Sequence, residues 1–133
     1  MNTEKLIIFQ KMYDFLLWLY PLIDRIPKSH RLVLGKHLEE LGLALLFSVI
    51  EANKIKTNTR RTIQLHMSDE LDKLMILVRL TKDLRFMSIA QYQNASEKMN
   101  EIGKMLYGWT NSHSGILNTE GKPKRVQTRE QLE

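Results

Sequence analysis

The chain contains no cysteine, and only three prolines and six glycines occur among its 133 residues. The absence of cysteine excludes a disulfide framework and any metal site built from thiolates. Small secreted domains normally depend on disulfides for stability, so an intracellular protein is expected. A single domain is expected too, because two domains of this combined length would each have too few apolar residues to form a core.

Long apolar runs are also missing. The first apolar cluster begins at Leu6, and Lys11 and Asp14 interrupt it before it reaches the length of a signal-peptide core or a membrane span. The sequence therefore predicts a cytoplasmic protein without a membrane segment.

Motifs of catalysis and metal binding are absent from the sequence. It has no glycine-rich phosphate loop, nucleophile elbow or zinc motif. His30 and His37 are seven residues apart, whereas helical metal sites usually space their ligands by three or four. The Glu-x-x-His pairs of di-iron bundles do not occur either. We interpret the histidines as surface residues, and predict that the protein is not an enzyme and binds no metal or cofactor.

The sequence has helical periodicity in four segments, of which the first covers residues 4–25. Apolar residues recur there at spacings of three and four, which places them on one face of a helix. Pro21 lacks the N–H that would bond back one turn, so a kink or an early end is expected near it. The residues predicted to face inward are Phe9, Met12, Leu16, Leu19, Ile23 and Ile26, with Tyr13, Leu17 and Tyr20 widening the face.

The second segment begins at Pro27 or Ser29, either of which can start a helix, and extends to about residue 53. Its inward stripe is predicted to contain Leu34, Leu38, Leu41, Leu45 and Val49. Its other side is apolar as well, with Leu43, Leu46, Phe47 and Ile50. A helix that is apolar on two sides must be buried on two sides, either at the centre of a bundle or against another subunit. We therefore expect a homo-oligomer.

The third and fourth helices are expected over residues 60–84 and 88–112. Thr57, Asn58 and Thr59 can cap the third helix, and Ser88 with Gln91 matches a capping box at the start of the fourth. The residues predicted to face inward are Ile63, Met67, Leu71, Leu74, Leu77 and Leu84 in the third helix, and Tyr92, Ala95, Met99, Ile102, Leu106 and Trp109 in the fourth.

Four helices joined by short links predict an all-α fold, an antiparallel up-down-up-down four-helix bundle. The bundle domain is expected to cover residues 1–112. Residues 113–133 are polar and contain two glycines after Ser114 and one proline, so they are expected to form a flexible C-terminal tail.

The net charge is +5 and the isoelectric point about 9.5, which favours anionic partners. The candidate residues for binding nucleic acid or a partner are Arg60, Arg61, Arg79, Lys82 and Arg85, with Arg25, Lys28 and Arg31 at the first link as a second group. The alternative is a solvated helix face, because Asp69, Asp72 and Asp83 supply opposite charge nearby. The basic run at residues 122–125 is either a nucleic-acid arm or part of a soluble tail.

Several motifs in the second half of the chain carry a family resemblance. They are RL-x-KDL at residues 79–84, S-x-x-QY at 88–92, SEK-x-NEIG at 96–103 and GW at 108–109. With these motifs, residues 5–112 resemble the accessory variability determinant (Avd) proteins of diversity-generating retroelements. Proteins encoded in 23S ribosomal RNA intervening sequences share the P-x-x-x-R start of the second helix, but their Asn-Ile-x-Glu-Gly end to that helix is missing here.

The resemblance implies a non-catalytic accessory protein. Members of the family form basic, ring-like homopentamers of four-helix bundles, bind the reverse transcriptase of the element and nucleic acid, and are needed for error-prone cDNA synthesis from the template-repeat RNA. The partners it implies are therefore a reverse transcriptase, template RNA, cDNA and further copies of the chain. The alternative is a structural or regulatory bundle that binds protein partners only.

Overall fold

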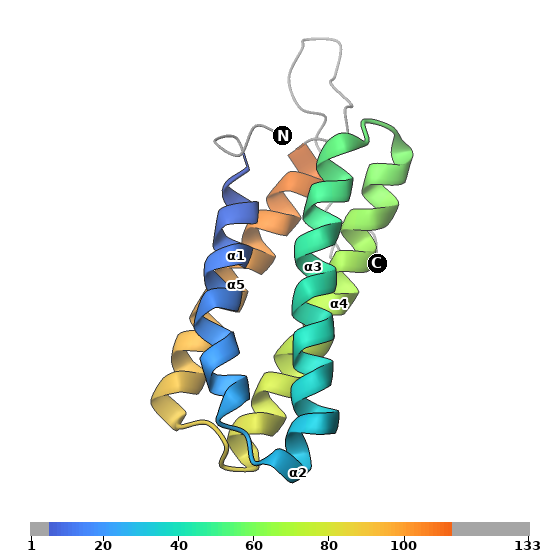
Figure 1. The fold of residues 1–133 in the computed structure, drawn as a ribbon. Coiled ribbons are helices and arrows are strands. Elements are labelled where there is room, and N and C mark those ends of the chain that lie inside the picture. Colours follow the sequence, from blue (N-terminus) through green and yellow to red (C-terminus); the bar gives the residue numbers. More distant parts are fainter. Residues whose placement is uncertain (1–5, 113–133) are drawn as a thin grey trace, which may run out of the picture.

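The structure, a computed structural model, describes residues 6–112 (Figure 1). Its elements are α1 (Ile7–Asp24), α2 (Lys28–His30), a π-helical turn η2 (Arg31–Gly35), α3 (Lys36–Lys54), α4 (Asn58–Asp83) and α5 (Ile89–Ser112). This range contains four long helices and no strand, so the predicted all-helical fold is confirmed. The predicted flexible tail at residues 113–133 and the basic run within it lie outside the described residues.

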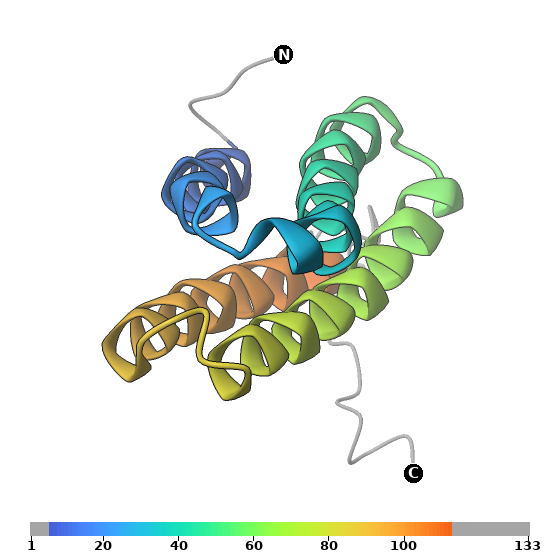
Figure 2. The same cartoon turned by 60° about the horizontal axis from the view of Figure 1, so that its bottom comes forward.

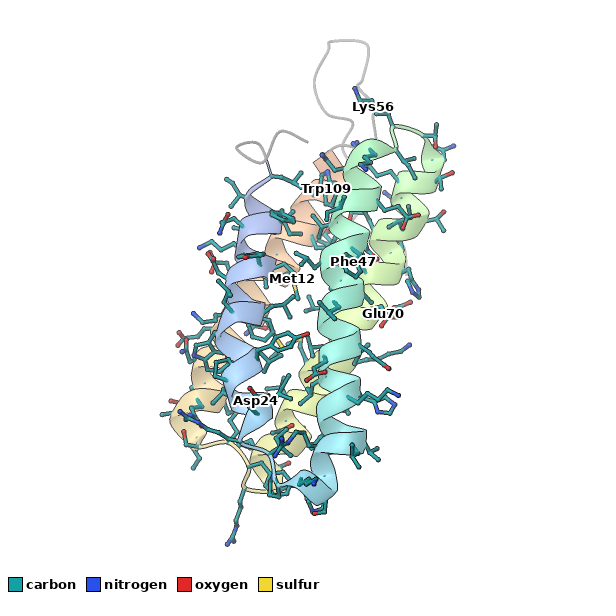
Figure 3. The ribbon with its side chains drawn as sticks, in the orientation of Figure 1. Met12, Asp24, Phe47, Lys56, Glu70 and Trp109 are labelled. Carbon is teal, nitrogen blue, oxygen red and sulfur yellow. The ribbon has the colours of Figure 1, made fainter. Side chains whose placement is uncertain are left out.

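The four long helices pack around one core. α1 and α4 each lie against both α3 and α5, as the two ribbon views show (Figures 1 and 2). The α1–α2 link and the α4–α5 link lie at one end of the bundle, and the α3–α4 link lies at the other (Figure 1). All four helices contribute fully buried side chains, among them Met12 (labelled in Figure 3), Leu19, Leu38, Leu45, Met67, Leu74 and Met99.

Three residues that the periodicity predicts to face inward are exposed instead. Tyr13 and Leu17 lie on the outer side of α1, because α3, α5 and η2 cover only the other side of this helix. Leu84 is the residue that ends α4, where the chain turns away from the neighbouring helices. The predicted inward face is therefore too wide in the first helix and one turn too long in the third.

α1 continues through Pro21 and ends at Asp24. Pro21 lies in the last turn, so its missing N–H removes a single hydrogen bond close to the C-terminal end of the helix. The helix then gives way to the link that carries Arg25 and Ile26.

The second predicted helix is not one regular α-helix. Between α2 and α3 the chain forms the π-helical turn η2, in which the N–H of Lys36 reaches the carbonyl of Arg31, five residues back. Gly35 permits this turn, since a Cβ there would lie 3.0 Å from Cγ of Arg31 and 3.3 Å from Cγ2 of Ile23. A π-turn adds one residue to a helical turn and leaves Leu32 and Val33 exposed.

Both predicted helix starts after the second helix have side-chain caps. The Thr57 hydroxyl accepts from the N–H of Thr59 at 3.3 Å, and α4 begins at Asn58, two residues earlier than predicted. In the capping box, the Ser88 N–H donates to Gln91 at 2.9 Å and the Gln91 N–H donates to Ser88 at 3.0 Å. The capping box is therefore confirmed.

None of the described helices is both long enough and apolar enough to cross a membrane.

Candidate nucleic-acid interface

The structure divides the predicted basic residues between the two ends of the bundle. α4 has 26 residues, so it is about 39 Å long. Arg60 and Arg61 lie in its first turn, whereas Arg79 and Lys82 lie in its last turns, at the end where Arg85 begins the α4–α5 link. One helix therefore carries these residues, but they do not form one surface.

Arg60 and Arg61 bind main-chain oxygens. Nε of Arg60 donates to the carbonyl of Ala52 at 2.8 Å, and its Nη2 donates to the carbonyl of Asn53 at 3.1 Å. The same guanidinium lies 5.8 Å from the ring centre of Trp109. Nη1 of Arg61 donates to the carbonyl of Thr110 at 3.4 Å. These two arginines thus tie the end of α3 and the end of α5 to the start of α4.

The other six basic residues gather at the opposite end, because the two links there lie together. The rings of His30, at the end of α2, and Phe86, in the α4–α5 link, have centroids 5.0 Å apart. This contact brings the group at the first link beside the group at the end of α4. We call the resulting surface the basic end, and it consists of Arg25, Lys28, Arg31, Arg79, Lys82 and Arg85.

Half of the basic end is already engaged within the protein. Nζ of Lys82 lies 3.0 Å from Asp83 and 4.6 Å from the ring centre of Tyr92. Nε of Arg79 lies 3.8 Å from the same carboxylate of Asp83. Nε of Arg31 donates to the carbonyl of Ile26 at 3.2 Å, which holds its guanidinium against the link. The two pairs with Asp83 agree with the alternative of a solvated helix face, in which nearby aspartates neutralise the basic residues.

The other half is open to solvent. Arg25, Lys28 and Arg85 are exposed, and the described residues offer them no side-chain hydrogen bond or ion pair. Arg85 has a φ of 68°, a left-handed conformation that reverses the chain sharply between α4 and α5. The segments 24–31 and 79–88 contain these six Lys and Arg residues and two aspartates, Asp24 and Asp83, so the basic end has a positive net charge.

A surface hollow lies beside these cations. Lys82, Asp83, Arg85, Ser88 and Gln91 line it together with apolar residues of the α4–α5 link and the start of α5. Its polar lining offers ammonium, guanidinium, hydroxyl and amide donors, which are the groups that phosphate oxygens accept from, beside one carboxylate, that of Asp83, which pairs with Lys82. The arrangement can hold anions, and the described residues contain no group of three or more His, Cys, Asp or Glu suited to a metal ion.

The family model described as bAvd-like matches the chain over residues 6–113. The chain belongs to this family. The resemblance to accessory variability determinants, predicted from the motifs of the second half, is therefore confirmed. The matched range contains all four long helices and ends one residue after α5. No curated protein and no solved structure gives a significant match.

A second surface is only partly anticipated from the sequence. In this bAvd-like chain, Phe47 of α3 and Ile76 of α4 are 60% and 66% exposed, and Leu80 is exposed as well. Leu41, Ala44, Ile76 and Leu77 line a groove between the two helices, with His37, Glu40, Glu70 and Lys73 also in its lining. We call this surface the α3–α4 apolar face.

The sequence pattern identifies one half of this face and misses the other. The surplus apolar side of the second helix points to Phe47. Leu43, Leu46 and Ile50, predicted with it, are half-buried, and Leu43 and Leu46 pack against the core. Ile76 and Leu80 are missed, although they follow Lys73 at helical spacing on the opposite side of α4 from Leu74 and Val78. A count of both apolar stripes in α4 would have identified them.

Proposed function

We propose that the protein is a non-catalytic accessory subunit of a diversity-generating retroelement. In this role it binds the reverse transcriptase of the element together with the template RNA and cDNA, and mutagenic cDNA synthesis requires it. Membership of the bAvd-like family carries the proposal, since the match covers every helix in the part of the chain that the structure describes.

The basic end is the proposed nucleic-acid surface. Arg25, Lys28 and Arg85 are free to bind phosphates, and Arg31, Arg79 and Lys82 add to the local field. The basic end has no element that resembles a base-reading module, so binding through this end is expected to depend on charge and to show little sequence preference. The reverse transcriptase and the shape of the RNA would then supply specificity for the template.

The α3–α4 apolar face is the proposed contact between subunits. Large exposed apolar side chains on two adjacent helices favour burial against another surface. We propose that antiparallel up-down-up-down bundles assemble through this face into a ring-like homopentamer. A ring repeats the basic end around one axis, so that weak phosphate contacts act together.

A second candidate function remains, namely a structural or regulatory bundle that binds protein only. Asp83 favours it, because its carboxylate already neutralises part of the charge of Arg79 and Lys82. Co-expression with the reverse transcriptase and template-repeat RNA separates the two functions. If polymerase and RNA both purify with this chain, the accessory role is supported. If only polymerase purifies with it, the protein-only role is supported.

Charge reversal tests the surface itself. Lys28→Glu with Arg85→Glu should lower the slope of log affinity against log salt by roughly 0.7 to 0.9 for each phosphate that the variant no longer binds, and should abolish cDNA synthesis. The matched control is Lys54→Glu with Lys56→Glu, two exposed lysines at the opposite end of the bundle (Lys56 in Figure 3). If the control variant fails to bind RNA and the variant with Lys28→Glu and Arg85→Glu still binds it, the proposed interface is at the wrong end of the bundle.

A further inference from the structure

A groove between α4 and α5 has features that the proposed function does not use. The two helices lie side by side (Figure 2), and residues of these two helices alone line the groove. Its lining includes Arg61, Gln64, Gly103, Lys104 and Tyr107. It is separate from the basic end and from the α3–α4 apolar face.

Two contacts fix the register of the helices along the groove. Arg61 reaches the carbonyl of Thr110 at 3.4 Å, and a Cβ on Gly103 would lie 3.5 Å from Cδ2 of Leu71. Gln64 is one turn beyond Arg61 in α4, and Tyr107 is one turn before Thr110 in α5. Gln64 and Tyr107 therefore lie at about the same level along the two helices, and both line the groove.

Gln64 is buried without a complete set of partners. Its side chain is only 1% exposed, yet its amide nitrogen has no acceptor among the described residues. A buried amide donor without a partner is unfavourable, and nearly all such groups in native proteins are satisfied. A group that enters the groove with an acceptor atom would satisfy it.

Gly103 leaves open space in the groove, and the packing of α4 against α5 does not require a glycine at this position. A glycine inside a helix lowers helix stability relative to alanine. A Cβ at Gly103 would meet Leu71 at 3.5 Å, an ordinary van der Waals contact, so alanine fits. Gly42 is different, because a Cβ there would collide with Leu16. Alanine at position 103 would therefore fit the fold and fill part of the groove.

We propose that this groove binds one unpaired nucleobase of a single-stranded RNA or cDNA, an inference that rests on the proposed function. The ring of Tyr107, 51% exposed, is a stacking surface for the base, and the Gln64 amide donates to an acceptor on the edge of the base. Arg61 and Lys104 supply positive charge for the adjoining phosphates. The groove also contains one acidic residue, Asp72, which is about 12 Å beyond Gln64 along the axis of α4.

The test measures binding of a fluorescein-labelled decaadenylate RNA to the full-length protein by fluorescence anisotropy. Tyr107→Ala should weaken binding roughly 5- to 150-fold with an unchanged salt slope, because the variant cannot stack the base but keeps every phosphate contact. Tyr107→Phe should retain the affinity. The control is Tyr13→Ala, an exposed tyrosine of α1, which should also retain it.

A pair of glycine variants tests the space in the groove. Gly103→Ala should weaken binding without lowering the melting midpoint, because the added methyl group enters the groove and fits the fold. Gly108→Ala is its control, since it adds the same methyl group to the same helix where no atom lies within 4 Å, outside the groove lining.

The outcomes separate this inference from the proposed function. If the wild type binds the RNA and both Tyr107→Ala and Gly103→Ala bind it equally well, the base site is wrong and the accessory role stands. If these variants fail to bind the reverse transcriptase and still bind the RNA, the groove binds a polypeptide and the base site is again wrong. If the wild type does not bind the RNA, both proposals fail together.

Discussion

Arg60 is expected to stabilise the fold rather than to bind nucleic acid. Its guanidinium donates to the carbonyls of Ala52 and Asn53 in the last turn of α3, at 2.8 Å and 3.1 Å, and lies over Trp109. The last carbonyls of a helix have no partner within the helix, so Arg60 supplies from α4 what α3 cannot. Truncation to alanine removes both hydrogen bonds and the contact with the ring.

The magnitude follows from these contacts. Hydrogen bonds to charged groups contribute about 1.5 to 3 kcal/mol each, but water can replace part of this at the partly exposed end of α3. The cation–π contact adds about 0.5 to 1 kcal/mol. Arg60→Ala should therefore reduce the free energy of unfolding by about 2 to 3 kcal/mol. For a chain of this length, that lowers the melting midpoint by roughly 6 to 12 °C.

The assay is thermal unfolding followed by circular dichroism at one protein concentration, because an oligomer melts at a midpoint that depends on concentration. Arg60→Lys keeps the charge but cannot donate to both carbonyls with a planar fork, so it should lose about half as much stability. Arg79→Ala is the control, since the Arg79 side chain is 71% exposed and should contribute within about 0.5 kcal/mol. Equal melting midpoints for Arg60→Ala and Arg79→Ala would refute the structural role.

Light scattering should show a homo-oligomer, and Phe47→Asp with Ile76→Asp should reduce its mass while the helix content persists; a monomeric wild type would contradict the proposed assembly. Deletion from His113 onward should leave the melting midpoint unchanged, because the described core and the family match end at residues 112 and 113; a drop of several degrees would show that the tail packs on the bundle. Burial, and secondly the charge of Glu39, raise the pKa of Tyr20. The contribution of Tyr20 to the free energy of unfolding is therefore fully present below about pH 10 and is lost as the pH rises through the raised folded pKa. Tyr20→Phe should remove the part of the alkaline destabilisation that is due to Tyr20, without changing the free energy of unfolding at pH 7.

Local patterns in the sequence predict much of the fold. Ala95, Met99, Ile102 and Leu106 recur at spacings of three and four, and all are buried in α5. The capping box at Ser88 depends on residues three apart, so it too could be predicted from the sequence. Such features are set within one helix turn, where spacing alone determines which side chains share a face.

Features that depend on contacts between helices could not be predicted in the same way. At the π-helical turn Gly35 lies close to Ile23 of α1, a contact that no local spacing reveals. The same limit applies to the basic residues, because the sequence places Arg60 and Arg79 on one helix but does not show that Arg60 is engaged by α3. The contact between His30 and Phe86, which unites the two groups of the basic end, joins residues 56 positions apart in the chain.

Asp83 gives the basic end a built-in competitor. Its carboxylate lies 3.0 Å from Lys82 and 3.8 Å from Arg79, so an anion that binds these side chains must displace it. A small monovalent ion gains little from that exchange, because it replaces one negative charge with another. If the basic end is the nucleic-acid surface, as proposed, a chain of phosphates that contacts Arg25, Lys28 and Arg85 in the same event is expected to displace the carboxylate more readily. The ion pairs of Asp83 would then favour polyanions over small anions.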